Sequence, residues 1–167
     1  DKLIEKSWHV PNFEIYTSME ASKKQAEYIR DGLDYDLWMN SIHRVLKESN
    51  VQKLHMMMTI NSLCLTTITD FMDEMLELRK EYGKRAPTMT LNILRFPSFQ
   101  SAAILPVNIK TFYKNRLEDW FFLNQQALTD GERASIQRLI DYLDIVKTPH
   151  KNTAEQDKLY HDFKAFF

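Results

Sequence analysis

The sequence predicts an α/β protein in which three parallel strands alternate with helices and a helical segment follows. Residues 13–17, 54–60 and 89–96 are short apolar stretches typical of strands. The second of these, LHMMMTI, is apolar at nearly every position, as are strands that a parallel sheet buries on both faces. Amphipathic patterns lie between the strands, and repeated strand–helix units imply parallel strands with right-handed crossovers.

Helical periodicity fills the segments between these strands. Residues 23–32 form a short helical pattern, whereas residues 37–49 and 67–82 form longer ones with apolar side chains on one face. Gly32 ends the first of these patterns at a plausible C′ position, where a helix commonly has a left-handed residue, and Gly83 ends the third.

The last third of the chain is helical throughout. One helix is predicted over residues 108–126 and another over 129–146, and a last one starts at residue 153. Thr129 followed three residues later by Glu132 is a capping-box signal for the start of the second helix.

Composition excludes several classes of function. The chain has 167 residues, of which 44% are hydrophobic, enough for one domain with a core. Its formal net charge is −1, which argues against a basic surface for nucleic acid. No apolar run approaches the roughly 20 residues that span a bilayer, and the charged N-terminal segment does not resemble a signal peptide. A single cysteine, Cys64, forms no internal disulfide, so we expect a reducing, cytoplasmic environment.

Polar side chains follow each predicted strand. Ser18 and Glu20 come after the first strand, Thr59 and Asn61 lie in and after the second, and Arg95 is at the end of the third. Ligands of α/β sheets bind at the carboxyl ends of the strands, which meet at one edge. The sequence therefore predicts a polar binding site at that edge.

Each of these residues also has an ordinary structural interpretation. The hydroxyl and carboxylate after the first strand could cap a helix that starts near Ser22. Arg30 could be a solvated charge at a helix end, Asn61 part of a turn, and Arg95 half of an ion pair with a helix acid. The methionines at 56–58 are expected in the core.

The stretch SMEA, followed by AEYIRDGLDYDLWMNSIHRVLK, resembles the middle of the radical S-adenosylmethionine (radical SAM) superfamily. In that family the fourth core strand ends in a Ser-Leu-Asp-Gly-like turn, and an arginine, a glycine and a helix follow. The counterparts here are residues 18–21, Arg30, Gly32 and residues 37–46. Residues 59–61 are similar to the turn after the family's next strand, and TLNILRFPSFQSAAILP resembles its sixth strand. Within the first turn, Glu replaces Asp and Ala replaces Gly.

The resemblance implies the second half of a partial (β/α)6 TIM-like barrel over residues 1–109. Residues 110–167 would be a helical extension toward a twitch or SPASM-type region. The family's Cys-x3-Cys-x2-Cys loop holds a [4Fe–4S] cluster, and no such loop occurs in this chain, in which Cys64 stands alone. The intact protein would therefore use S-adenosylmethionine and a cluster held by a missing N-terminal barrel half, and this chain alone would be inactive.

The resemblance also assigns roles to the polar residues. Ser18 and Glu20 would lie beside the ribose and methionine of S-adenosylmethionine, and Arg30 would pair with the methionine carboxylate. Thr59 and Asn61 would bond ribose hydroxyls or the adenine edge.

Arg95 would face the substrate, which could be a peptide or a small molecule. The first strand would have an open sheet edge, where the missing barrel half pairs or where copies self-associate. The five histidines show no metal-ligand spacing, so we expect no metal site in the chain itself.

A second hypothesis is a non-catalytic α/β binding or scaffold module that docks a protein partner through its helical tail. The tail is rich in aromatic side chains, which favour protein contacts when exposed. They are Phe112, Trp120, Phe121, Phe122, Tyr160, Phe163, Phe166 and Phe167.

Overall fold

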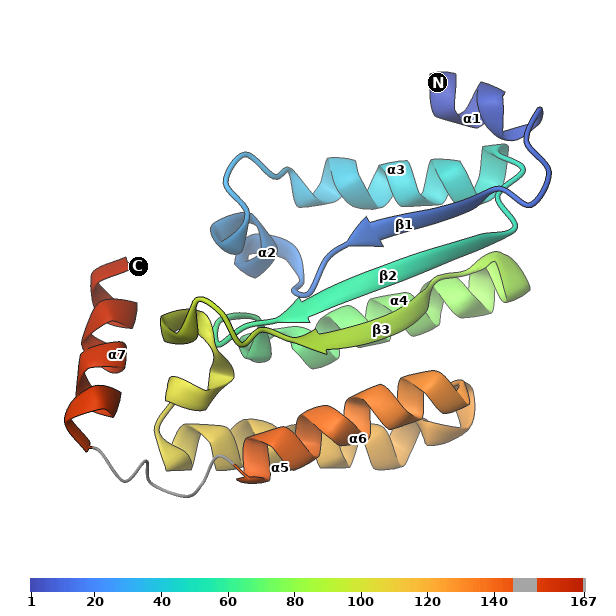
Figure 1. The fold of residues 1–167 in the computed structure, drawn as a ribbon. Helices are drawn as coiled ribbons and strands as arrows, with labels where there is room; N and C mark the ends of the chain where they lie inside the picture. Colours follow the sequence, from blue (N-terminus) through green and yellow to red (C-terminus); the bar gives the residue numbers. More distant parts are fainter. Residues whose placement is uncertain (146–152, 167) are drawn as a thin grey trace.

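The computed structural model describes residues 1–145 and 153–166, and these contain one three-stranded sheet. The strands are β1 (Glu14–Ser18), β2 (Lys53–Ile60) and β3 (Thr88–Ile93), in the order β1-β2-β3. Both strand pairs are parallel. The prediction of an α/β fold with three parallel strands is confirmed (Figure 1).

Seven helices accompany the sheet in the described residues. They are α1 (Lys2–Ser7), α2 (Lys23–Ile29), α3 (Tyr35–Glu48), α4 (Ile68–Tyr82), α5 (Val107–Asn124), α6 (Asp130–Ile145) and α7 (Thr153–Phe166). Helix α4 ends directly before Gly83, as predicted, and Gly83 has φ +58°. Gly32 also has a positive φ, +76°, but it lies in the turn beyond the end of α2 rather than next to it.

The third strand is shorter than predicted. Leu94 still donates its N–H to the carbonyl of Ile60 at 2.9 Å, but the strand assignment ends at Ile93 rather than at Phe96. Pro97 has no N–H to continue a ladder. Arg95 therefore lies in the loop after the strand.

One face of the sheet is covered by helices. Leu54, Met56, Met58 and Ile60 alternate along β2 and are fully buried on this face. Figure 1 shows α4 passing behind the strands, and the core that joins this face to the helices includes Phe71 of α4. The expectation that both faces are buried was wrong, because Thr59, between two of these core residues, is exposed.

The α5–α6 hairpin lies beside β3 at the edge of the sheet (Figure 1). The predicted capping box starts α6, because the Glu132 N–H donates to Thr129 Oγ1 at 3.3 Å and the Thr129 N–H donates to Glu132 Oε2 at 2.8 Å. Leu117 and Trp120 of α5 pack with Leu139 of α6 in the same core.

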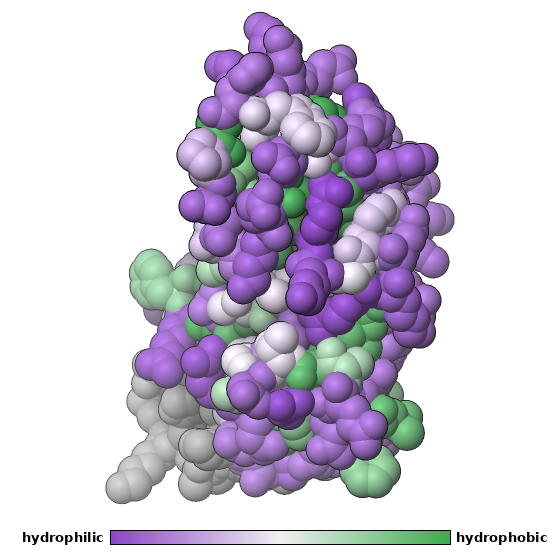
Figure 2. Space-filling view, turned by 90° about the vertical axis from the view of Figure 1, so that its right-hand side faces the viewer, coloured by the Kyte–Doolittle hydropathy of each residue, from purple (hydrophilic) through white to green (hydrophobic). Residues whose placement is uncertain are grey.

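The side of the molecule shown in Figure 2 is mainly hydrophilic, and its hydrophobic residues appear as separate spots. Within the described ranges, no helix has both the length and the apolar character that crossing a membrane requires.

Candidate functional site at the open face of the sheet

The second face of the sheet carries polar side chains from all three strands. We call it the open face, and it is turned toward the viewer in Figure 1 because α4 lies behind the strands. The strand register places its side chains in rows. They are Glu14, Tyr16 and Ser18 of β1, His55, Met57 and Thr59 of β2, and Thr88, Thr90 and Asn92 of β3.

Two of the predicted cofactor-binding residues lie at the carboxyl end of the open face. Ser18 is opposite Met57 in the register, and Thr59 is opposite Asn92. Ser18, Thr59 and Asn92 are all exposed, so their polar groups are accessible to a ligand. Ser18 and Thr59 therefore lie at the same end of the open face.

Glu20 and Arg30 bind each other. Arg30 Nη2 lies 2.6 Å from Glu20 Oε2, and the Glu20 side chain is only 4% exposed against 35% for Arg30. The buried carboxylate thus has a charge partner within the chain. The guanidinium that was expected on a ligand carboxylate is held by Glu20, and its buried Nε has no hydrogen-bond partner among the described residues.

Asn61 organises the turn after β2. Its Oδ1 accepts the backbone N–H of Leu63 at 2.9 Å and that of Cys64 at 3.0 Å, so the side-chain oxygen builds the turn. The Cys64 thiol donates to the Asn61 carbonyl, and burial raises the pKa of this thiol well above its usual value.

Arg95 lines a cleft of about 500 Å³ together with Asn92 and Arg138. Asp141 and Tyr142 of α6 complete its polar lining. Arg138 was not predicted as a site residue. Helical periodicity shows which residues of α6 are exposed, but it does not show which of them lie next to the end of a strand.

A hydrogen-bonded cluster centred on His55 occupies the amino-terminal half of the open face. His55 Nε2 lies 3.2 Å from Glu14 Oε2, and His55 Nδ1 lies 3.1 Å from Thr88 Oγ1. The Tyr16 ring stacks on the imidazole at a centroid distance of 4.3 Å. The period of two along β2 places His55 on the same face as Thr59.

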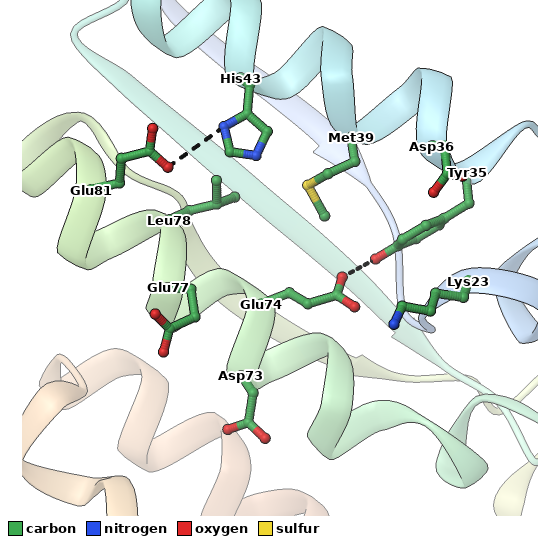
Figure 3. Close-up of a pocket in the computed structure, with 10 residues that line it drawn as sticks. All are labelled: Lys23, Tyr35, Asp36, Met39, His43, Asp73, Glu74, Glu77, Leu78 and Glu81. Carbon is green, nitrogen blue, oxygen red and sulfur yellow. Dashed lines mark hydrogen bonds and ion pairs between the residues drawn. The ribbon is translucent and has the colours of Figure 1, made fainter.

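An acidic cleft of about 390 Å³ lies between α3 and α4, on the helix side of the molecule (Figure 3). Glu74 is its central residue, because it accepts hydrogen bonds from Tyr35 and, at 2.6 Å, from Ser22 Oγ. Burial and the Glu74 carboxylate raise the pKa of Tyr35. Glu74 is therefore half-buried and bonded within the chain, whereas Asp73 of the same helix is exposed.

The described residues do not fit an iron–sulfur cluster. They contain no group of three or more His, Cys, Asp or Glu residues placed to hold a metal ion. Cys64 is fully buried and its thiol is protonated, whereas cluster ligation needs several thiolates. The carboxyl end of the open face, in contrast, presents two exposed hydroxyls and one exposed amide, which can donate and accept hydrogen bonds.

Comparisons of the chain with protein-family models, with curated proteins and with solved structures each found no match.

Proposed function

We propose that this chain binds S-adenosylmethionine at the carboxyl end of its open face, as the second half of a partial (β/α)6 TIM-like barrel of the radical SAM type. The observation that carries the proposal is the asymmetry of the sheet. Helices cover one face, and the other presents exposed polar groups at its carboxyl end. In a barrel the helices lie outside and the opposite strand face lines the interior, where ligands bind at the carboxyl ends of the strands.

In this proposal the exposed hydroxyls of Ser18 and Thr59 contact the ribose and methionine parts of the ligand. The Glu20–Arg30 ion pair fixes the turn that follows Ser18, and Arg30 offers the methionine carboxylate its remaining donors. Asn61 keeps its side-chain oxygen in the turn and offers its amide N–H groups to the ligand.

The two sheet edges support a missing barrel half that pairs with β1. At β3 the outward N–H of Met89 donates to Glu132 Oε1 at 2.8 Å, and the outward carbonyl of Leu91 accepts from Arg138 Nη2 at 2.5 Å. These side chains occupy the positions that a further strand would use. In the described residues β1 has only β2 as a neighbour, so its outer edge is the one that can accept a strand. That partner segment would hold the [4Fe–4S] cluster, in a cytoplasmic protein that is inactive without the segment.

Calorimetric titration with S-adenosylmethionine and S-adenosylhomocysteine tests the proposal. Ser18→Ala and Thr59→Ala each remove one hydrogen-bonding hydroxyl and should weaken binding by roughly three- to tenfold. Ser41→Ala is the matched control, because Ser41 is exposed on α3 and its hydroxyl donates to the carbonyl of Leu37 in its own helix. Absence of binding at millimolar ligand, or equal binding by the Ser18 and Thr59 double variant, would reject the proposal.

A second candidate is a binding module whose helical segment docks a protein partner. It is favoured by two neighbouring apolar side chains near the end of α5, since Phe122 is 74% and Leu123 79% exposed. Trp120 is not available for contact with a partner in this structure, because it is buried and its Nε1–H donates to Asp73 Oδ1 at 2.7 Å.

Sedimentation of the purified chain tests the form of docking in which the partner is a second copy. A Phe122→Ser and Leu123→Ser double variant should abolish concentration-dependent association. Association that persists in this variant, or a wild-type chain that stays monomeric at every concentration, would reject self-docking through α5.

A further inference from the structure

We infer that the cleft between the end of β3 and α6 is a binding site for a small anion that carries a carboxylate or phosphate group. Its two cationic side chains are Arg95, from the loop after β3, and Arg138, from α6. The claim that this anion belongs to the substrate rests on the proposed function. The claim that an anion binds here rests on the two arginine side chains alone.

Arg138 is held in place by the strand beside it. Its Nη2 donates to the Leu91 carbonyl at 2.5 Å, which anchors the guanidinium at the carboxyl-terminal half of β3. No other hydrogen bond or ion pair holds this side chain in the part of the chain that the structure describes. A guanidinium has five N–H donors, so most of its donors remain for a ligand.

Arg95 has no partner among the described residues. It is exposed, two residues beyond β3, and its side chain makes no hydrogen bond or ion pair there. It lines the same cleft as Arg138, so two guanidiniums meet at one concave surface.

The other arginines show that these two are unusual. Within residues 1–145 and 153–166, five arginines pair with a carboxylate of the chain, namely Arg30, Arg44, Arg79, Arg116 and Arg133. Arg85 instead donates to the carbonyl of Ser49. The two guanidiniums that lack a carboxylate and line one cleft are thus Arg95 and Arg138.

The rest of the lining favours a small anion rather than a cation. Among the described residues that line the cleft, Asp141 is the one carboxylate, and its Oδ1 already accepts from Gln137 Nε2 at 2.8 Å. The two arginines therefore leave a surplus of one positive charge. Asn92 adds an exposed amide, and the Tyr142 hydroxyl bonds Ser101 Oγ at 3.0 Å.

Guanidinium groups recognise carboxylates and phosphates by parallel N–H···O bonds, which explains the proposed ligand class. Asn92 lines this cleft and is the register neighbour of Thr59. An anion held there would place the remainder of its molecule beside the proposed S-adenosylmethionine position.

Nuclear magnetic resonance titration of the full chain tests the inference. Inorganic phosphate and glutarate are added separately, with chloride keeping the ionic strength constant, and backbone N–H shifts are followed. We expect saturable shifts at residues 92–95 and 138–142 with at least one anion, and the anion that binds more tightly identifies the phosphate or carboxylate class. Arg95→Gln should weaken binding by about tenfold.

Two further variants control the result. Arg44→Gln removes an exposed arginine of α3 that pairs with Asp1 and Glu48, and it should bind the anion as the wild type does. Arg138→Lys keeps the positive charge but loses the planar fork, so it should bind more weakly. A thermal melt shows whether Arg138→Lys stays folded. Arg95→Gln tests the site in either case, because the Arg95 side chain makes no hydrogen bond or ion pair with the residues that the structure describes.

The outcomes separate this inference from the proposed function. No saturable shift with either anion, or equal binding by Arg95→Gln, overturns the anion site. Binding of the anion without any binding of S-adenosylmethionine supports the anion site and rejects the proposed function. Binding of S-adenosylmethionine that is unchanged in Arg95→Gln, together with anion binding that is weakened, supports both.

Discussion

Arg79 of α4 and Glu132 of α6 form a largely buried ion pair that links the two helices. Arg79 Nη2 lies 2.6 Å from Glu132 Oε1, and Arg79 Nη1 donates to Glu132 Oε2 at 3.1 Å. The Glu132 side chain is 1% exposed and also accepts the N–H of Met89 and that of Thr129, each at 2.8 Å. One carboxylate thus joins a helix start, a strand edge and a neighbouring helix.

Replacing Glu132 with Gln should lower the free energy of unfolding by about 3 kcal/mol, because the change leaves the Arg79 guanidinium without its counter-charge in a largely buried position. Urea unfolding followed by circular dichroism measures the change. Glu77→Gln is the control, since Glu77 is 69% exposed and Lys80 is its one ion-pair partner among the described residues, and it should alter stability by less than about 0.5 kcal/mol. Equal stability of the two variants would contradict the role assigned to Glu132.

Acid should destabilise the chain partly through Glu132. Burial raises the pKa of this carboxyl, but hydrogen bonds from Arg79, Met89 and Thr129 outweigh burial and hold the pKa below its usual value of 4.5. The unfolded chain therefore binds the proton more readily. The stabilising contribution is complete above pH 4.5 and is lost as the pH falls through the folded-state pKa. The urea concentration at the midpoint of unfolding should decrease as the pH is lowered through this range. The decrease should be smaller for Glu132→Gln than for the wild type. Parallel curves would contradict this origin.

Asn61→Ala should lower the free energy of unfolding by about 1 kcal/mol, as does the loss of a helix cap, because the N–H groups of Leu63 and Cys64 lose their acceptor. Asn40→Ala is the control, since Asn40 is exposed on α3 and alanine is at least as good a helix former. Differential scanning calorimetry compares the two. An unchanged melting temperature for Asn61→Ala would mean that the turn does not need this side chain.

Cys64 should report opening of the core. The side chain is fully buried, and burial raises the pKa of its thiol, so the folded chain contains very little reactive thiolate. A thiol-reactive disulfide reagent should modify the protein slowly at neutral pH, with a rate that rises with urea in step with unfolding. The urea-unfolded chain provides the rate for a fully accessible thiol. Modification of the native protein at that rate would show that this part of the core opens freely.

The α/β class and the three parallel strands could be predicted because their signals are local. The apolar run of β2, the glycine after α4 and the capping box at Thr129 each depend on a few neighbouring residues. The end of β3 was missed because its apolar pattern continues to Phe96, whereas pairing with β2 stops near Leu94.

The candidate site was predicted only in part, because its contacts join residues far apart in the sequence. The exposure of Ser18 and Thr59 follows from the alternation of side chains along a strand. The partners of Arg30 and Glu74, and the approach of Arg138 to Leu91, depend on how helices pack against the sheet. The periodicity of the sequence does not predict how the helices pack against the sheet.

The difference between the two sheet edges limits how copies of this chain can assemble. In the part of the chain that the structure describes, Glu132 and Arg138 occupy the hydrogen-bonding groups of the β3 edge, which leaves the β1 edge as the one where a strand can be added. If two copies pair through β1, the accessible edge of each copy is paired, and no edge remains for a third copy. Association by this route therefore ends at a closed pair and cannot propagate into a fibre.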